Sequence, residues 1–522
     1  MKSIASRSGR PPKICHIVAT TEGATWAFEQ LRDLRDQHGF EVAAILNGDK
    51  GTLVERFKSA GIAVHSADFD FTSTGELLAL PSKVFQLVRL LRREKFDVTH
   101  SHLFHSMVIG RIAAWFADVP VRLSMIAGPF HLEAYTPRWI DRYTLWLDTA
   151  IIASCEFTRS LYTAMGVPKK RLPLIYYGPN EDKFDPHSVA PAGLRAEYGL
   201  SPDTPLIGLI AYFYSELPVN RWIPEHIQGR SVKRQEDLIR AAPLILKEFP
   251  KAKILFIGSG WEQGGKQYLE RMLALATELN LGESVIFSGY RTDIPAVLRD
   301  LDVAVQCSVS ENLGGTIESL LMECPTVATR VGGMVDSVID GETGLLVRPA
   351  DPESLAEGVL RLLRDPETAR RYGRAGRERM LSNFTLRHTV DQLATLYRDR
   401  LNRAPTGYRP LASGFRFVSG GLLSLVVVMR YCLLDAYLLP RWDQGWRPWR
   451  TNALSTLAPR ILIYRFYAFV GRHPTNFGIR RRIRNAFSSP APRMLLYRFY
   501  AFVGRHPTNF GIRRRIKKWL GR

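Results

Sequence analysis

From Lys13 to about Asn402, short apolar, β-rich runs alternate with longer stretches whose apolar residues recur at helical spacing. The short runs are typical of buried strands and the longer stretches of amphipathic helices. This alternation predicts βαβ units and doubly wound parallel sheets. The predicted strands begin at Ile14, Phe40, Ile62, Phe96, Val121, Ala150 and Leu172, and then at Leu206, Ala252, Ser284, Asp302, Thr326 and Gly344.

A stretch that contains several prolines and glycines, from Gly178 to Pro205, interrupts the alternation and is typical of an interdomain linker. We therefore predict two Rossmann-like α/β domains, at 1–190 and 191–402, and a tail at 403–522. Two such domains in tandem can face a central cleft, where the carboxyl ends of both sheets meet one ligand.

The tail has a different composition. Its apolar segment from Phe417 to Met429 has 13 residues, whereas about 20 are needed to span a bilayer. We expect this segment to dip into a membrane or to lie along it. A 25-residue sequence at 459–483 recurs at 492–516 with two differences, and each copy joins aromatic residues to an arginine cluster. Two copies are too few for a solenoid, so a tandem duplication is the simplest explanation.

Charge is concentrated in the same tail. Of the net charge of +21, 18 units come from residues 444–522, which contain no acidic residue, so residues 1–443 carry +3. Arginine and aromatic residues together suit an anionic membrane surface. A nucleic-acid arm is a weaker alternative, and a solvated tail is the third. The apolar run at Ile14 is too short for a signal peptide, and the five scattered cysteines fit a reducing compartment. We expect a cytoplasmic protein, peripheral on the cytoplasmic face of the membrane.

Two glutamates flank a glycine pair after the strand predicted at Asp302. Gly314 and Gly315 are expected to open a helix, with Glu311 on the loop before it and Glu318 one turn inside it. A helix start offers unpaired N–H groups to a diphosphate, and carboxylates accept hydrogen bonds from the vicinal hydroxyls of a ribose or a sugar. The alternative is a helix whose acidic residues merely complement its own dipole.

The sequence segments around these glutamates resemble those of a known protein family. The segment "SENLGGTIESLLMECPTVATRVGGMVDSVIDGETGLLV" from Ser310 resembles the signature block of glycosyltransferase family 4, which has the GT-B fold. The segments "IIASCEFTRSLYTAMGV", "VKRQEDLIRAAPLILKEFPKAKILFIGSG" and "VIFSGYRTDIPAVLRDLDVAV" are similar to other parts of that family. The resemblance covers roughly residues 13–400, and the combination is more specific than any one piece.

The resemblance implies a role for each matching residue. Glu318 matches the glutamate that holds the nucleotide ribose, and Glu311 matches the one near the donor sugar. Six residues separate them here, where the family usually has seven, and Ser310 occupies the expected spacing. Lys233 matches the lysine that neutralises the donor diphosphate, a role in which a fixed cation stabilises the departing charge. Taken in isolation, Lys233 could equally be a solvated helix residue.

Other matches are less complete. The family's arginine before the lysine has two candidates, Arg230 and Arg221, because residues 214–231 look like an insertion. Arg291, in the stretch that begins at Val285, is expected on the donor side. Gly23 follows the first strand at the place of the family's glycine-rich loop. His131 is a candidate for the family's first-domain histidine, which would otherwise be absent.

Two further patterns suggest metal sites. His100, His102 and His105 follow one another at a strand end, but no carboxylate or cysteine completes a site there, so we expect surface or cleft-lining histidines. The Asp-x-Asp triplets at Asp68 and Asp300 are expected not to bind metal, because the tandem architecture differs from that of the metal-dependent glycosyltransferases. We expect no essential metal and no other cofactor.

The resemblance implies a retaining glycosyltransferase that moves a sugar from a nucleotide-sugar donor to a hydroxyl of a glycan or lipid-linked acceptor, in polysaccharide or cell-envelope glycan biosynthesis. One alternative is another GT-B enzyme, such as a sugar-nucleotide epimerase or a phosphorylase. The other is a non-catalytic protein that binds membrane or nucleic acid on the same scaffold.

Overall fold

The computed structural model of this chain describes residues 10–404, 421–422 and 424–429. Two six-stranded parallel sheets carry the fold, in the orders β3-β2-β1-β4-β5-β6 and β12-β11-β10-β7-β8-β9. Counted from its own first strand, each sheet has the doubly wound order 3-2-1-4-5-6, which confirms the Rossmann-like expectation. The first sheet contains β1 (Lys13–Val18), β2 (Glu41–Leu46), β3 (Ala63–Ser66), β4 (Val98–His102), β5 (Val121–Met125) and β6 (Ala150–Ile152). The second contains β7 (Leu206–Ile210), β8 (Lys253–Ile257), β9 (Val285–Gly289), β10 (Val303–Gln306), β11 (Thr326–Thr329) and β12 (Leu345–Val347).

One predicted strand is wrong. The segment from Leu172 makes only an isolated bridge, between Ala153 and Leu174. The remaining predicted strands correspond to β1–β12. The failure has a local cause, since Pro173 lacks a donor for a regular strand ladder.

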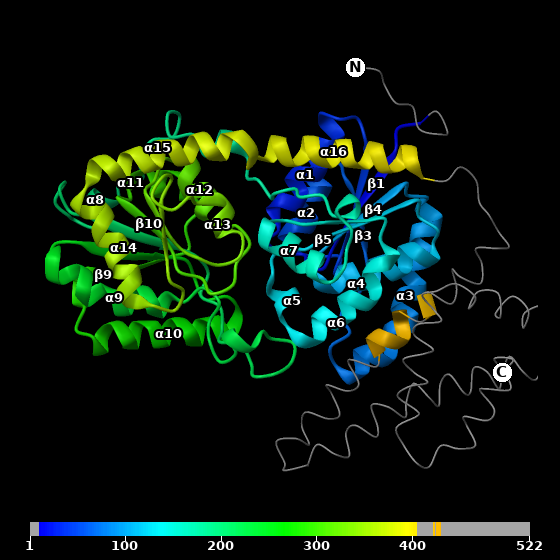
Figure 1. Ribbon diagram of the computed structural model, residues 1–522, viewed down its shortest axis with the longest axis horizontal. Coiled ribbons are helices and arrows are strands. Elements are labelled where there is room, and N and C mark those ends of the chain that lie inside the picture. Colours follow the sequence, from blue (N-terminus) through cyan, green and yellow to red (C-terminus); the bar gives the residue numbers. More distant parts are fainter. Residues whose placement is uncertain (1–9, 405–420, 423, 430–522) are drawn as a thin grey trace, which may run out of the picture. The chain divides into compact units, whose positions relative to one another are not determined.

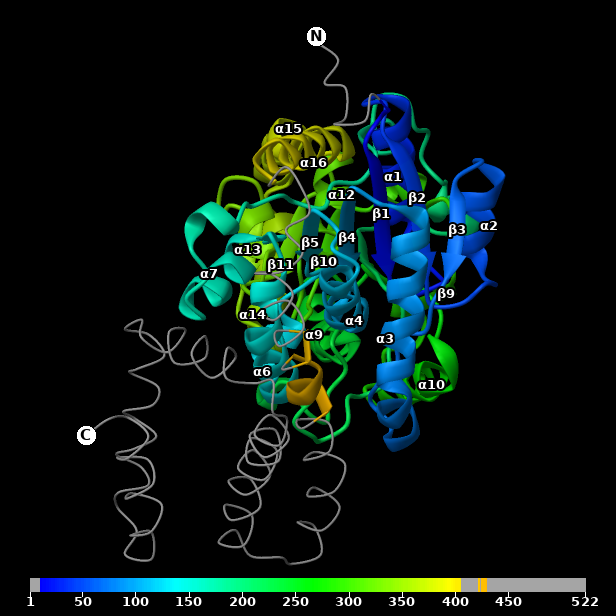
Figure 2. The same ribbon diagram turned by 90° about the vertical axis from the view of Figure 1, so that its right-hand side faces the viewer.

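Helices cover both faces of the first sheet. Alternate residues of β1 separate two cores, with Ile14 and Val18 in one and Cys15 and Ile17 in the other. Helices α1 (Thr25–Asp36) and α2 (Thr52–Ser59) pack on the first of these faces. Helices α3 (Thr74–Glu94) and α4 (Phe104–Phe116) pack on the opposite face, where Figure 2 shows them together. The short α5 (Phe130–Glu133), α6 (Tyr135–Thr144) and α7 (Glu156–Ala164) follow β5 and β6.

The second sheet is covered in the same way. One face packs on α9 (Gln235–Glu248), α10 (Glu262–Glu278) and α14 (Pro352–Arg364) through Leu238, Tyr268 and Leu355. The other face is covered by the remaining helices of this half of the chain. These are α8 (Leu194–Glu197), α11 (Ile294–Asp300), α12 (Thr316–Leu321), α13 (Met334–Ser337) and α15 (Pro366–Asn383).

The last long helix crosses back to the first sheet. Helix α16 (Leu386–Arg403) follows α15 directly, and its Val390, Leu393 and Tyr397 are buried in the core formed with α1 and α2 (Figure 1). The predicted second domain extends to residue 402, whereas α16 at its end packs on the first sheet. The crossing is tied to the earlier linker, because the Leu386 amide donates to the Pro179 carbonyl at 2.8 Å.

The described part of the apolar tail segment contacts the globular body. Val428 is fully buried in the core that also contains α3 and α4 residues. The sequence did not predict this packing on the body, and the expectation that 417–429 lies in or along a membrane stays a prediction for the exposed side of the segment. The basic stretch and the duplication at 459–483 and 492–516 lie outside the described residues. Across the residues that are described, none of the helices combines the length and apolar character that crossing a bilayer requires.

Candidate active site

The candidate site begins at the switch point of the second sheet, where the strand order reverses between β7 and β10. Two loops meet at this edge. The Val309 amide donates to the Val232 carbonyl at 3.0 Å, and the Cys307 thiol donates to the Lys233 carbonyl at 3.2 Å. These bonds bring the predicted lysine beside the predicted glutamate block.

Lys233 and Glu311 form an ion pair through Nζ and Oε2, with four-fifths of each side chain buried. Ser308 donates to the same carboxylate oxygen at 3.2 Å. Burial opposes the lysine's charge, but the nearby Glu311 carboxylate outweighs burial and raises the pKa of Lys233. The lysine is therefore a fixed cation, and the structure does bring together these two residues that the sequence places 78 positions apart.

The glycine pair shapes the loop that carries Glu311. Gly314 has φ +58°, a left-handed conformation, and a Cβ there would lie 3.0 Å from the Glu311 Cγ. A Cβ on Gly315 would lie 2.6 Å from the Gln306 amide nitrogen. Close packing within the chain is thus enough to require both glycines. The helix they open, α12, ends at Leu321.

Glu318 lies half-buried in α12. Burial raises its pKa to about 7, the Glu29 carboxylate adds to this, and Lys233 opposes it. Glu29 comes from α1 of the first sheet and pairs with Lys183. The site therefore contains carboxylates from both halves of the chain.

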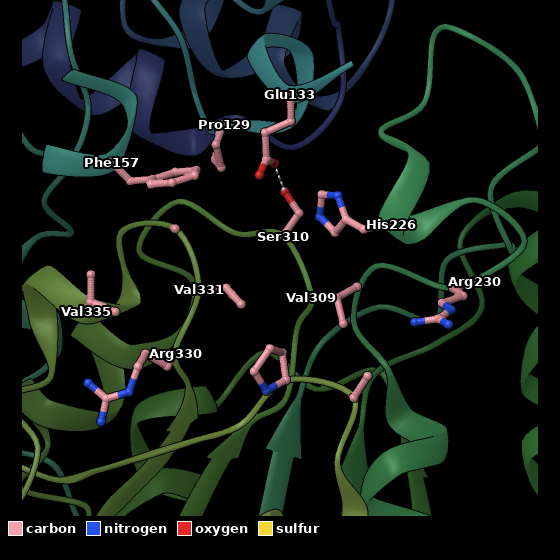
Figure 3. A pocket seen from close by; sticks show the side chains of 13 residues that line it. Pro129, Glu133, Phe157, His226, Arg230, Val309, Ser310, Arg330, Val331 and Val335 are labelled. Atoms are coloured by element: carbon pink, nitrogen blue, oxygen red, sulfur yellow. Dashed lines mark hydrogen bonds between the residues drawn. The ribbon is translucent and has the colours of Figure 1, made fainter. Parts of the chain in front are cut away.

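A pocket of about 400 Å³ lies next to this loop (Figure 3). Glu133 and Phe157 line it from the first half of the chain, and Arg230 and Ser310 from the second. The Ser310 hydroxyl donates to Glu133 Oε2 at 3.2 Å, and burial raises the pKa of Glu133. Ser310, at the family's usual spacing, thus faces the pocket, whereas Lys233, Glu311 and Glu318 are not among its lining residues. Sequence reasoning missed Glu133; its only signal was its position two residues after His131.

The first-domain candidates lie near this pocket or before α1. His131, in α5, stacks on Phe104 with ring centroids 4.9 Å apart, and burial lowers its pKa to about 3. It is therefore a neutral imidazole. Gly23 is exposed with φ +63°, just before α1. This left-handed backbone conformation is enough to explain why a glycine occupies the position.

The three candidate arginines, Arg230, Arg221 and Arg291, have different surroundings in the structure. Arg230 lines the pocket, whereas the Arg221 guanidinium lies over the Tyr135 ring at 5.2 Å. Arg291 pairs with Glu197 at 2.8 Å and Asp293 at 2.7 Å. These two acids raise the pKa of Arg291 above its usual value. Arg291 is therefore engaged in an ion-pair network within the protein.

Sequence analysis also missed an aromatic group near Lys233. Tyr212 stacks on Tyr290 at 6.0 Å between centroids and contacts Trp261 edge-on at 5.0 Å. Tyr290 is 61% exposed. Tyr214, 6.2 Å from Tyr212 between centroids, is close enough to Lys233 for the ammonium to act on its pKa, although burial raises that pKa overall. The tyrosines follow β7 and β9, so exposed aromatic faces stand at the same sheet edge as the cation.

The histidine expectation is wrong for two of its three residues. His100 and His102 are fully buried, together with His16 of the neighbouring strand β1. His16 Nε2 and His100 Nδ1 lie 3.0 and 2.7 Å from the Tyr397 hydroxyl of α16. His102 Nδ1 lies 2.9 Å from the Tyr177 hydroxyl. A core position for this cluster could not be inferred from the strand alone, because the pairing with β1 and α16 creates it.

The three rings could approach one ion, since one nitrogen from each lies within 4.8 Å of the others. The cluster is fully buried and its hydrogen-bond partners are the hydroxyls of Tyr397 and Tyr177, so it supplies no negative charge to offset a buried dication. Its chemistry favours a neutral hydrogen-bonded group. The Asp-x-Asp triplets have structural partners as well, since Asp68 pairs with Lys83 and Asp302 with Arg195, both at 2.7 Å.

Comparisons with known proteins give a consistent result. A family model described as "Glycosyl transferase 4-like domain" matches residues 22–178, and one described as "Glycosyl transferases group 1" matches residues 228–379. EpsD of Bacillus subtilis (strain 168) is 28% identical over 60% of this chain and 79% of that protein. A GDP-mannose-dependent alpha-(1-6)-phosphatidylinositol monomannoside mannosyltransferase of Mycolicibacterium smegmatis is 30% identical over 47% of this chain and 61% of that protein.

Solved structures agree on the fold. HepE from Anabaena, solved in complex with UDP and glucose, is 19% identical, with a TM-score of 0.60 over 74% of this chain and 99% of that one. At this identity the likeness concerns the fold alone. The matched families are described as transferases, which leaves the epimerase, phosphorylase and non-catalytic alternatives without support.

Proposed function

Because the chain belongs to the glycosyltransferases that join a glycosyl transferase 4-like domain to a group 1 domain, we propose that Lys233 and its surroundings bind a nucleotide-sugar donor. The sugar passes to a hydroxyl of a glycan or lipid-linked acceptor. The observation that carries this proposal is the Lys233–Glu311 ion pair at the switch point of the second sheet.

Each group has a role that follows from its chemistry. Lys233 neutralises the donor diphosphate, with Arg230 as the second cation, because charge grows on the leaving group as the sugar departs. Glu318 accepts hydrogen bonds from the ribose hydroxyls. The exposed face of Tyr290 offers a stacking surface to the base. Glu311 holds Lys233 in place before the donor binds. When the donor binds, contacts with the donor replace part of the Lys233–Glu311 contact.

The acceptor side involves the first half of the chain. Glu133 and His131 face the pocket or lie beside it, and Gly23 lies at the edge of the first sheet. Glu133, with its pKa raised by burial, is suited to accept a proton from an attacking hydroxyl. We further propose that the two cations make an essential metal unnecessary, so a chelator should leave turnover unchanged.

A thermal-shift screen tests donor binding. UDP-, GDP-, ADP- and dTDP-sugars are each added to the full-length protein, since a ligand at about 100 times its Kd stabilises the folded state by about 2.7 kcal/mol. One nucleotide class should raise the melting temperature, and Lys233→Ala should diminish that shift. Lys247→Ala is the matched control, because Lys247 is exposed near the end of α9. The absence of a shift with every donor would refute the proposal.

The membrane proposal concerns the basic tail. Residues 444–522 supply 18 Lys or Arg and no acidic residue, a composition that favours anionic lipid headgroups on the cytoplasmic face. The full-length protein should sediment with vesicles containing phosphatidylglycerol, and binding should weaken at high salt. A chain that ends at residue 443 should bind more weakly. Equal binding by both chains would contradict a role for the tail.

A further inference from the structure

The outer face of α6 and the turn after it forms an aromatic and basic stripe. Tyr135, Tyr143 and Trp146 are 45%, 45% and 38% exposed. Steps of four, four and three residues lead from Tyr135 through Trp139 and Tyr143 to Trp146, so these positions share one side of the helix and of the turn after it. We call this the α6 stripe; it consists of Tyr135, Arg138, Trp139, Arg142, Tyr143 and Trp146.

The rings of the stripe support one another. Trp139 stacks on Tyr143 with centroids 5.8 Å apart, and the Arg142 guanidinium lies over Trp139 at 5.6 Å. The Trp146 indole donates to the Tyr143 carbonyl at 2.8 Å and packs edge-on against Trp115. These contacts hold amphipathic rings at the surface in a fixed array, at little cost in side-chain entropy when a partner binds.

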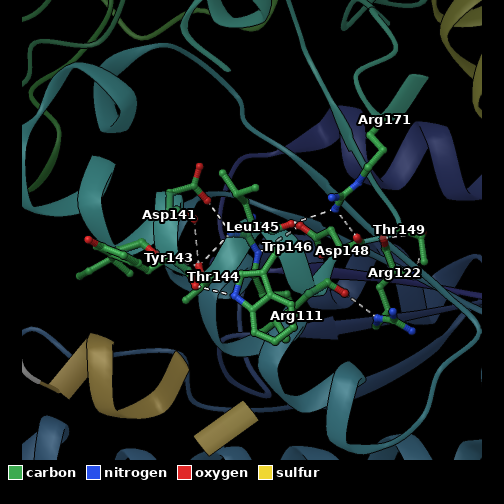
Figure 4. Close-up of polar contacts among 12 residues, drawn as sticks. Arg111, Arg122, Asp141, Tyr143, Thr144, Leu145, Trp146, Asp148, Thr149 and Arg171 are labelled. Atoms are coloured by element: carbon green, nitrogen blue, oxygen red, sulfur yellow. Dashed lines mark hydrogen bonds and ion pairs between the residues drawn. The ribbon is translucent and has the colours of Figure 1, made fainter. Parts of the chain in front are cut away.

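The stripe is positively charged because the one acidic residue of α6 points inward. Asp141 is buried and pairs with the buried Arg111 at 2.5 Å (Figure 4). The described residues offer no carboxylate as an ion-pair partner to Arg138 or Arg142. Arg221, placed over Tyr135, adds a third guanidinium beside the stripe.

Exposed apolar residues continue this surface. The helical residues 421–422 and 424–429 bury Val428 in the same core as Ile140 of α6. On their outer side, Leu422 is 48% exposed and Val426 is 38% exposed. The segment that packs on this core therefore also presents exposed aliphatic side chains.

The pocket lies at the start of the same helix. Glu133, which lines the pocket and accepts from Ser310, is two residues before Tyr135. A surface in contact with the α6 stripe would therefore lie close to the opening used by an acceptor.

We propose that the α6 stripe docks on an anionic lipid bilayer and holds the pocket near the headgroups. Tyrosine and tryptophan favour the interface between water and hydrocarbon, and guanidinium groups bind phosphate. Leu422 and Val426 add apolar burial. The residues of this contact all belong to the described part of the chain. The delivery of a lipid-linked acceptor rests on the proposed function, whereas the docking does not.

Charge reversal in the full-length protein tests the docking. Arg138→Glu/Arg142→Glu should lower partitioning onto vesicles of phosphatidylcholine with phosphatidylglycerol by about 30-fold or more, since each arginine near such a surface contributes a factor of about five. The matched control is Arg370→Glu/Arg374→Glu, with the same spacing and charge change on the exposed side of α15. The control should lose much less. Equal losses in the two variants, or a loss under twofold in the α6 variant, would overturn the proposal.

A second measurement does not depend on charge. Brominated lipids quench tryptophans that enter the interface, so Trp139→Phe/Trp146→Phe should remove part of the quenching in bound protein. Unchanged quenching would overturn the proposal. An α6 charge variant that still binds vesicles but no longer binds a single-stranded oligonucleotide would also overturn it. The thermal-shift response to nucleotide sugars, measured without vesicles, should stay the same in the α6 charge variant. A failure of donor binding is therefore distinguishable from a failure of docking.

Discussion

Acidification from about pH 7.5 to about pH 5 should destabilise the first sheet through its three buried histidines. His16, His100 and His102 are fully buried, and burial lowers the pKa of each. Tyr397 has one hydroxyl proton, so it donates to one neutral ring and accepts from the N–H of the other. A second proton on either ring turns an acceptor nitrogen into a donor and disrupts this pattern.

The magnitude follows from His16, whose pKa is lowered to about 3. The unfolded chain has the ordinary value of about 6.5, so between these values the unfolded state binds more protons than the folded state. The free energy of unfolding therefore increases with pH in this window, and it decreases as the pH falls below about 6.5. At about pH 5, His16 alone lowers it by about 2 kcal/mol. His100 and His102 act in the same direction, because burial lowers their pKa values as well.

Urea unfolding at a series of pH values, followed by circular dichroism, measures this effect. Other titrating groups contribute to the wild-type slope, so the informative quantity is the difference between variants. Between about pH 7.5 and about pH 5, His16→Leu should lose about 2 kcal/mol less than the wild type. His187→Leu is the control, because its side chain is 76% exposed and lies outside the cluster. It should follow the wild-type curve.

Two results would refute this reasoning. One is a His16→Leu curve parallel to that of the wild type, which would mean that His16 is not held neutral by the fold. The other is a wild-type free energy of unfolding that increases as the pH falls from 6.5 to 5. That result would show that buried carboxyl groups with raised pKa values, which act in the opposite sense, dominate the first sheet.

Three further predictions concern the site and the core. Lys233→Ala should reduce kcat by about 100-fold or more with a smaller change in donor Kd, measured by steady-state kinetics and calorimetry, since a fixed cation acts most strongly on the transition state. Donor affinity should decrease as the pH falls below about 7, because Glu318 then takes up a proton, and Glu29→Gln should move the midpoint of this decrease to lower pH. Donor affinity that calorimetry finds to be independent of pH would contradict the role of Glu318 in binding the ribose. Arg111→Met should lower the free energy of unfolding by about 3–5 kcal/mol in urea, because the buried Asp141 and Asp148 lose their cation; a loss under about 1 kcal/mol would contradict the importance of this ion-pair network.

The sequence predicts the fold well because its signals are local. A buried parallel strand is a short apolar run whatever its neighbours are, so β1–β12 were found individually. The wrong strand at Leu172 had the same apolar signal, and Pro173 was the available warning. The family resemblance brought Lys233 and Glu311 together before the structure did, although neither residue is distinctive by itself.

The features that sequence reasoning missed all depend on which segments meet. The helical pattern of α16 indicates an apolar face but not which sheet that face covers, and it covers the first. The histidine cluster depends on the same crossing, because Tyr397 supplies the hydroxyl that two of the rings share. Glu133 becomes noticeable only when Ser310 approaches from the other half of the chain. A residue whose role requires a partner from a distant segment has no local signature, and in this chain such residues include both the pocket acid and the group that ties the last helix to the first sheet.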